Sequence, residues 1–341
     1  MNRNSERIPR SLLRGSSILF WRDSDMTPES FSRLYEQSDI IIGEGAVIER
    51  LRRDTQWELD PHVVNAAFIY EEEKRAVLAS IYRQYLDVGF SSGLPLLLST
   101  PTWRASRERI KTAGYEDQAV NEDNYRFLDA LRSAYGAYAD KVAICGLMSC
   151  RGDAYNPSER LSEDDARRFH AWQARKLAET GVDFLLASTL PALSEATGIA
   201  LAQAATGKPY IISFVFRPDG TLLDGTPLKD AVSAIDAKVN PRPLAYMCNC
   251  THASIFRSAM MHETRVLPHV RKRVVGLLAN TAALEPEELD RSKELVTEAP
   301  EIFGRDVASL HREFGMKILG GCCGTDQRHI QSLATHFDIP S

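Results

Sequence analysis

Eight short apolar runs recur along the sequence, and they limit its possible folds more than any other feature. They span residues 39–46, 94–100, 141–148, 182–189, 209–216, 243–250, 273–280 and 315–321. Apolar runs without strict alternation are typical of parallel strands buried on both faces. Amphipathic stretches with helical spacing lie between them, most clearly in residues 124–140, 166–180 and 306–314. Eight strands alternating with about eight helices predict a single (β/α)8 barrel, a TIM barrel of the α/β class.

The chain length fits this prediction. At 341 residues the chain exceeds the ~250 of a typical (β/α)8 barrel, which leaves room for long loops. A doubly wound sheet is the alternative, but no glycine-rich phosphate-binding turn follows the first run. No linker rich in Gly, Ser or Pro divides the chain. We therefore predict one catalytic domain over residues 39–341, with residues 1–38 as an N-terminal extension that caps the floor of the barrel.

The composition indicates a cytoplasmic protein whose partners are small molecules. A net charge of −5 and a pI near 6.0 give no electrostatic case for binding nucleic acid. No apolar run approaches the ~20 residues that cross a bilayer, so no membrane partner is expected. The N-terminal ILFW is shorter than the ~7–15 apolar residues of a signal-peptide core. The sequence gives no indication of the oligomeric state.

Three of the six cysteines fall where a barrel enzyme carries its active site. Cys250 ends the sixth run, and Cys322 and Cys323 follow the eighth, with glycines on both sides. Active sites of such barrels lie at the carboxyl ends of the strands, and strands six and eight are separated by only one strand. Zinc binds thiolates at about 2.3 Å, and catalytic zinc keeps three protein ligands with one open position. The pattern predicts a zinc site of these three cysteines.

The other three cysteines are weaker candidates. Cys145 lies within an apolar run, where a free cysteine usually behaves as a small hydrophobe. Cys150 falls in a loop and is left unassigned. Cys248 lies two residues before Cys250, so on a regular strand both side chains would face the same side.

Six segments in order along the chain carry a family resemblance. They are GEGAVIERL from Gly43, STPTWRAS from Ser99, the stretch from residue 170 to 196 ending LPALSEA, NC at residues 249–250, LLANTAA from Leu277 and GGCCGT from Gly320. Together they cover the chain from about residue 40 to about residue 334 and resemble the homocysteine S-methyltransferase family. Its members transfer a methyl group from betaine or a sulfonium donor to homocysteine.

The resemblance implies a zinc enzyme that forms methionine and so contributes to methionine biosynthesis. It carries the catalytic and zinc-binding roles onto Cys250, Cys322 and Cys323. It also implies a set of residues that bind the substrate: Glu44, Gly45, Ala46, Ser99, Thr100, Thr102, Ser188, Thr189 and Asn249. Within this set, Glu44 would meet the substrate ammonium, the hydroxyls after the second run would hold its carboxylate, and Asn249 would position the loop that bears Cys250.

Simpler roles are open for several of these residues. Ser99, Thr100 and Thr102 could cap a strand-to-helix turn. Glu44 could be a solvated charge on the rim of the barrel. His252, beside the predicted zinc site, could support a ligand or start a helix.

Two positions depart from the family pattern. Ser188 stands where the family has a glutamate that binds the substrate ammonium, so another thiol or a selenol is an alternative substrate. Arg104 stands where betaine-using members have a tyrosine, and a cation there would repel a quaternary ammonium. A sulfonium donor is therefore expected in preference to betaine. A barrel that binds zinc or a thiol without catalysis is the alternative from another functional class.

Overall fold

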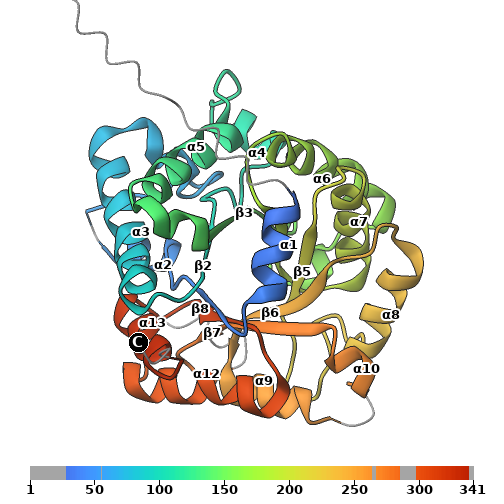
Figure 1. The fold of residues 1–341 in the computed structure, drawn as a ribbon. Coiled ribbons are helices and arrows are strands. Elements are labelled where there is room, and N and C mark those ends of the chain that lie inside the picture. The colour runs from blue at the N-terminus through green and yellow to red at the C-terminus, as the bar shows by residue number, and fades with distance from the viewer. Residues whose placement is uncertain (1–27, 55, 263–265, 285–296, 338–341) are drawn as a thin grey trace, which may run out of the picture.

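The computed structural model describes residues 28–54, 56–262, 266–284 and 297–337. Eight parallel strands close into a barrel in which each strand pairs with the next and β8 pairs with β1 (Figure 1). The strands are β1 (Ile41–Gly43), β2 (Leu96–Ser99), β3 (Val142–Met148), β4 (Phe184–Leu190), β5 (Tyr210–Phe214), β6 (Ala245–His252), β7 (Val274–Asn280) and β8 (Ile318–Gly321). All eight predicted strands and the (β/α)8 fold are confirmed.

Helices surround the barrel and follow the predicted alternation (Figure 1). The α-helices are α1 (Pro28–Gln37), α2 (Ile48–Arg53), α3 (Glu72–Ser92), α4 (Arg107–Thr112), α5 (Val120–Ser133), α6 (Glu163–Ala178), α7 (Leu193–Ala204), α8 (Leu228–Lys238), α9 (Ala253–Met260), α10 (Pro268–Arg271), α12 (Pro300–Phe314) and α13 (Gln327–Thr335). Short 3₁₀ helices are η1 (Ala66–Tyr70), η2 (Gly136–Lys141) and η3 (Pro157–Glu159). The helix predicted over residues 124–140 ends at Ser133, and η2 begins at Gly136, whose φ of 59° is left-handed.

Two apolar layers hold the strands in place. Inside the barrel, side chains such as Leu97, Phe184 and Met247 form one buried cluster, and the outward-facing side chains pack against the helices in another. The two-sided burial explains why the strands appear in the sequence as continuous apolar runs. None of the helices in the described part of the chain is both long and apolar enough to cross a membrane.

Helix α1 lies across one end of the barrel (Figure 1). Its Phe31 is fully buried and stacks on Phe184, with the ring centroids 4.1 Å apart. Phe184 is the first residue of β4, so the helix lies at the amino ends of the strands, opposite the predicted active site. Residues 1–27 lie outside the described residues, and the domain boundary at residue 38 stays a prediction.

Candidate active site

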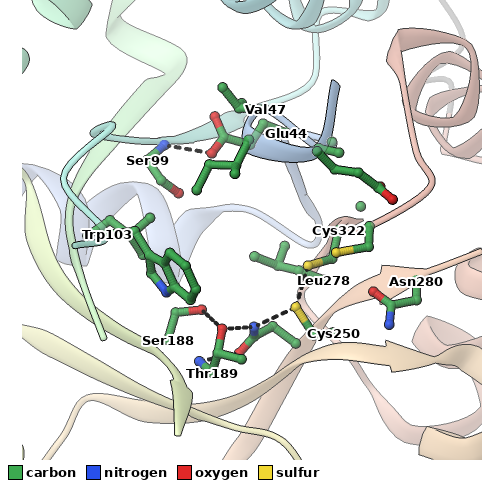
Figure 2. A pocket seen from close by; sticks show the side chains of 18 of the residues that line it. Glu44, Val47, Ser99, Trp103, Ser188, Thr189, Cys250, Leu278, Asn280 and Cys322 are labelled. Carbon is green, nitrogen blue, oxygen red and sulfur yellow. Dashed lines mark hydrogen bonds between the residues drawn. The ribbon is translucent and has the colours of Figure 1, made fainter. Parts of the chain in front are cut away.

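A cavity of about 790 Å³ lies at the carboxyl ends of the strands. Its volume falls within the range of pockets that hold small molecules. Figure 2 shows the side chains of Glu44, Trp103, Cys250 and Cys322 around this pocket. Of the predicted site residues, those that line it are Glu44, Gly45, Ala46, Ser99, Thr100, Ser188, Thr189, Asn249, Cys250, Cys322 and Cys323.

The three predicted zinc ligands converge on one wall of the pocket. Their sulfur atoms all lie within 4.8 Å of one another, and the Sγ atoms of Cys250 and Cys322 are 2.6 Å apart. Hydrogen bonds from Cys322 and Cys323 hold the pKa of the Cys250 thiol well below its usual range. The same bonding to Cys250 raises the pKa of each of its two neighbours. The three sulfur atoms therefore share the negative charge that forms when the first thiol ionises. A bound cation would favour loss of the remaining thiol protons.

Glycines shape the turn that carries the cysteine pair. A Cβ atom on Gly321 would lie 2.3 Å from the Thr325 hydroxyl, and Gly324 has a left-handed φ of 84°. The Thr325 hydroxyl donates to the Cys322 carbonyl over 2.6 Å and accepts from the Ala46 amide over 3.0 Å. The turn after β8 is thus fixed against the loop after β1.

A β-bulge aims Cys250 into the pocket. The pairing of β6 with β7 shifts register between Asn249 and Thr251, and Cys250 has a left-handed φ of 52°. Cys248 instead joins the apolar cluster between the barrel and the helices, where burial raises the pKa of its thiol. The prediction that Cys248 faces the same side as Cys250 is therefore wrong, because the bulge breaks the alternation of the strand.

A second bulge lies in β4, which is separated from β6 by β5 alone. The pairing of β4 with β5 shifts between Ala187 and Leu190, and Thr189 has a φ of 61°. Asn249 joins the two bulges. Its Oδ1 accepts from the Thr189 amide over 2.9 Å, while its Nδ2 donates to the Thr189 hydroxyl over 2.7 Å and to the Cys250 sulfur over 3.4 Å. Both strands run on beyond the predicted ends, to Leu190 and His252.

Glu44 turns inward at the end of β1. Its Oε1 accepts from the Ser99 amide over 3.2 Å, while its buried Oε2 has no hydrogen-bond partner. Burial raises the pKa of this carboxyl to about 8. The alternative of a solvated rim charge is therefore wrong. A partnerless buried acceptor facing a cavity suits a cationic group of a ligand.

The two residues after Glu44 are held by helix α3. The Tyr85 hydroxyl donates to the Ala46 carbonyl over 2.7 Å. A Cβ atom on Gly45 would lie 2.7 Å from the Tyr85 hydroxyl oxygen, so a larger residue at position 45 would displace this hydroxyl.

The hydroxyls after β2 differ in their surroundings. Ser99 and Thr100 line the cavity, but the Thr100 hydroxyl already accepts from the Leu147 amide over 3.0 Å. Thr102 is fully buried outside the lining, and its hydroxyl donates to the Leu147 carbonyl over 2.7 Å. The structure gives Thr102 a role in tying the turn after β2 to β3.

Arg104 is fixed at the edge of the pocket. Its guanidinium carbon lies 4.3 Å from the centre of the Trp103 ring. Its Nη1 donates to the carbonyls of Cys150, over 2.9 Å, and Gly152, over 2.6 Å. One face of the indole is therefore already covered by a cation of the protein itself.

Three further residues reach the site without having been predicted as substrate or metal contacts. Tyr155 lines the pocket, where burial and then the nearby thiols of Cys250, Cys323 and Cys322 raise its pKa well above the usual range. Asn280 lines the pocket and has a buried Oδ1 with no hydrogen-bond partner. Glu49, on α2, also lines it and accepts from the Gly324 amide. Tyr155 lies in a long loop with no motif to mark it, and the position of Asn280 at a strand end was the only available signal.

His252 starts helix α9. Its Nδ1 accepts from the Ser254 amide over 3.2 Å, as an N-cap residue does. Its Nε2 lies 3.5 Å from a carboxylate oxygen of Glu298. Of the two roles open for this histidine, the structure supports the helix start.

The sequence matches known proteins along most of its length. The model of the family "Homocysteine S-methyltransferase" matches residues 41–337. Homocysteine S-methyltransferase of Escherichia coli is 24% identical over 327 residues, covering 88% of this chain and 96% of that protein. Homocysteine S-methyltransferase YbgG of Bacillus subtilis is 28% identical over 198 residues, covering 58% of this chain and 60% of that protein. The chain thus spans about three-fifths of the length of YbgG.

Solved structures share the fold. The crystal structure of the homocysteine methyltransferase MmuM from Escherichia coli in its oxidised form superposes with a TM-score of 0.71 at 21% identity, covering 90% of this chain and 99% of that chain. The metallated form of the same protein gives a TM-score of 0.68 at 19% identity, with the same coverage of both chains.

Proposed function

The chain belongs to the homocysteine S-methyltransferase family and is a methyltransferase, and from this premise we propose that it methylates the thiol of homocysteine with zinc as cofactor. The methyl carbon leaves a small donor and bonds to the homocysteine sulfur, the thiol proton goes to solvent, and methionine is formed. The observation that carries the proposal is the convergence of Cys250, Cys322 and Cys323 on the pocket wall. Family membership favours this enzyme over a barrel that binds zinc or a thiol without catalysis.

The residues at the cluster fit zinc. Three thiols offer the number of protein ligands that a catalytic zinc site uses. The unpartnered Oδ1 of Asn280 lines the same pocket, where it could bind the ion or a water. Zinc bound by the three cysteines would lower the pKa of an incoming thiol, which is only a few per cent ionised at neutral pH when free.

The remaining residues bind and orient the amino-acid part of the substrate. We assign the ammonium to the carboxylate of Glu44, whose Oε2 has no other partner. The Ser99 hydroxyl and the backbone after β2 would hold the carboxylate, with Gly45 and Ala46 forming the adjacent wall. Asn249 keeps Cys250 aimed at the pocket, because it bonds both the Cys250 sulfur and Thr189. Holding both reactants in line converts a bimolecular displacement into an effectively unimolecular one.

Ser188 leaves the pocket with one carboxylate fewer than the family pattern. Its buried hydroxyl lies 3.4 Å from the Thr189 hydroxyl, so a neutral hydroxyl stands where the family pattern has a carboxylate. A lost charge-assisted contact costs about 1.5–3 kcal/mol. Weak homocysteine binding, or methylation of another thiol or selenol, follows from this substitution as the second candidate function.

The donor is proposed to be a sulfonium such as S-methylmethionine or S-adenosylmethionine. Arg104 is held in place by two backbone carbonyls and stacks on Trp103, so the cation that replaces the family tyrosine cannot swing away without breaking these contacts. A fixed guanidinium where betaine-using members have a tyrosine opposes the quaternary ammonium of betaine. Because a sulfonium is also a cation, this argues against betaine without choosing between the two sulfonium donors. We also propose that the protein acts in the cytoplasm, in methionine biosynthesis.

Calorimetric titration of L-homocysteine into zinc-loaded protein tests the function first. Repeating it in two buffers of different ionisation enthalpy counts the protons released. We expect at least one proton per homocysteine bound, no binding of homoserine, and loss of the signal in Cys322→Ser. Methyl transfer is then assayed with S-methylmethionine, S-adenosylmethionine and betaine. Absence of transfer from every donor would overturn the proposal, and binding of other thiols in place of homocysteine would support the second candidate.

A further inference from the structure

The loop between β3 and α6 forms a wall of the pocket that none of the proposed homocysteine contacts uses. Asp153, Ala154 and Tyr155 of this loop line the cavity. Tyr155 and Cys250 line the same cavity. The residues proposed to hold homocysteine come instead from the ends of β1, β2, β4, β6 and β8, so the loop lines the part of the cavity left for the methyl donor.

The same loop fixes Arg104. The Arg104 Nη1 donates to the backbone carbonyls of Cys150 and Gly152, and it lies 3.3 Å from the carbonyl of Arg151. Because these acceptors are backbone atoms, the position of the guanidinium depends on the path of the loop. Displacing the loop would therefore move both Tyr155 and Arg104.

A single buried carboxylate outside the loop binds both of its ends. The Oε1 of Glu195, on α7, accepts from the Arg151 amide over 2.7 Å, and its Oε2 accepts from the Leu161 amide over 3.2 Å. The neighbouring Ser194 hydroxyl donates to the Leu161 carbonyl over 2.9 Å. The first turn of α7 thus fixes the backbone at Arg151 and at Leu161, and residues 152–160 extend between these two positions.

His170, on α6, completes the arrangement. Its Nε2 lies 3.0 Å from the Glu195 Oε1, and both side chains are only 1% exposed. Because a carboxylate only accepts, the histidine donates from Nε2. Burial alone would raise the pKa of Glu195, but the hydrogen bonds from His170 and the backbone amides outweigh it and lower this pKa. The carboxylate is therefore stable as an anion in the interior.

We propose that Glu195 is a positioning residue for methyl transfer, which holds the loop of residues 151–161 in the place where Tyr155 and Arg104 shape the donor side of the pocket. The inference rests on the proposed function for its kinetic part only. A glutamine at this position has the same shape but only one acceptor oxygen. One of the three donors would then face an amide NH₂ group, and a buried donor left without an acceptor is costly.

The test compares Glu195→Gln and Glu195→Asp with Gln203→Leu. Gln203 is a matched control on the same helix, because it is fully buried and its side-chain amide has no hydrogen-bond partner in the described part of the chain. Hydrogen exchange of the zinc-loaded protein reports on the amides of Arg151 and Leu161 without any need for activity. We expect Glu195→Gln to accelerate exchange by about ten-fold or more at the amide that then faces the NH₂ group, and Gln203→Leu to leave both amides unchanged.

Kinetics then separate positioning from general damage. We expect Glu195→Gln to raise the donor KM or lower kcat by about ten-fold, while zinc content and the homocysteine Kd stay within about two-fold of wild type. Glu195→Asp, which keeps both acceptor oxygens, should recover part of the loss. Unchanged exchange at the two amides, or equal losses in donor and homocysteine binding, would overturn the inference. If no donor is active, the proposed function fails, and the exchange measurement alone decides whether Glu195 holds the loop.

Discussion

Replacing Glu44 with glutamine should change how the stability of the protein depends on pH. The folded protein raises the pKa of this carboxyl from 4.5 to about 8 because it is buried. Below pH 4.5 the group is protonated in both states and contributes nothing to the pH dependence. Between pH 4.5 and 8 the unfolded chain has lost the proton while the folded protein still binds it. Unfolding therefore releases a proton, and stability falls as pH rises.

The magnitude follows from the size of the shift. One pKa unit corresponds to about 1.4 kcal/mol, so the full penalty above pH 8 is about 5 kcal/mol. Between pH 5 and pH 7 the wild type should lose about 2–3 kcal/mol of unfolding free energy through this residue alone. Glu44→Gln removes this titration. The substitution also lowers the unfolding free energy, because the side-chain amide of the glutamine near Ser99 is left without a partner. This loss is the same at both pH values.

Urea unfolding of metal-free, reduced protein at pH 5 and pH 7 measures the effect. The difference in unfolding free energy between variant and wild type should shift by about 2–3 kcal/mol in favour of Glu44→Gln on going to pH 7. Other titrating groups are common to both proteins and cancel in this comparison. A difference that does not change with pH would mean that the Glu44 carboxyl is solvated, and it would remove the basis for assigning it to the substrate ammonium. Homocysteine binding should reverse the penalty, because an ammonium beside the carboxylate favours its charged form.

Three further predictions concern the pocket. Ser188→Glu should tighten homocysteine binding by about ten-fold or more, since one charge-assisted contact contributes about 1.5–3 kcal/mol, and titration calorimetry would detect it. Weaker binding would instead indicate that the pocket fits another thiol. Cys322→Ser should lose zinc under reducing conditions, whereas Cys248→Ala should retain one zinc per chain, as metal analysis would show, because Cys248 faces the helices. Asn249→Ala should lower zinc affinity by about ten-fold, measured in competition with a chelator, because it removes the side chain that joins the two bulges. An unchanged affinity would contradict the role of Asn249 in positioning Cys250.

The fold was predictable because the barrel imposes its burial pattern directly on the sequence. Each strand is covered inside by the barrel core and outside by helices, so its apolar run is continuous and easy to recognise. The convergence of the three cysteines followed from topology alone, since strands six and eight are close in any eight-stranded barrel. Glu44 was predicted as a substrate contact from the family resemblance, but its burial was not predictable, because it depends on the packing around the end of β1.

The direction of Cys248 could not be predicted, because it depends on a backbone irregularity. A regular strand places Cys248 and Cys250 on one side, and the bulge at Cys250 reverses this. Tyr155 was missed for a related reason. It is delivered by a long loop whose path is set by Glu195, which lies forty residues later in the sequence. Local sequence patterns carry no information about such a long-range contact.

The two bulges explain why the site can be rigid although its backbone is strained. Thr189 and Cys250 both adopt left-handed φ values, which cost a residue with a side chain about 1–3 kcal/mol each. Neither position could relax alone, because the side chain of Asn249 bonds the amide and the hydroxyl of Thr189 and also the sulfur of Cys250. The hydrogen bonds of Asn249, whose side chain is only 2% exposed, thus offset the backbone strain at both residues. Relaxing β4 would release Cys250 as well, so the direction of this thiol is coupled to the same strand that carries Ser188.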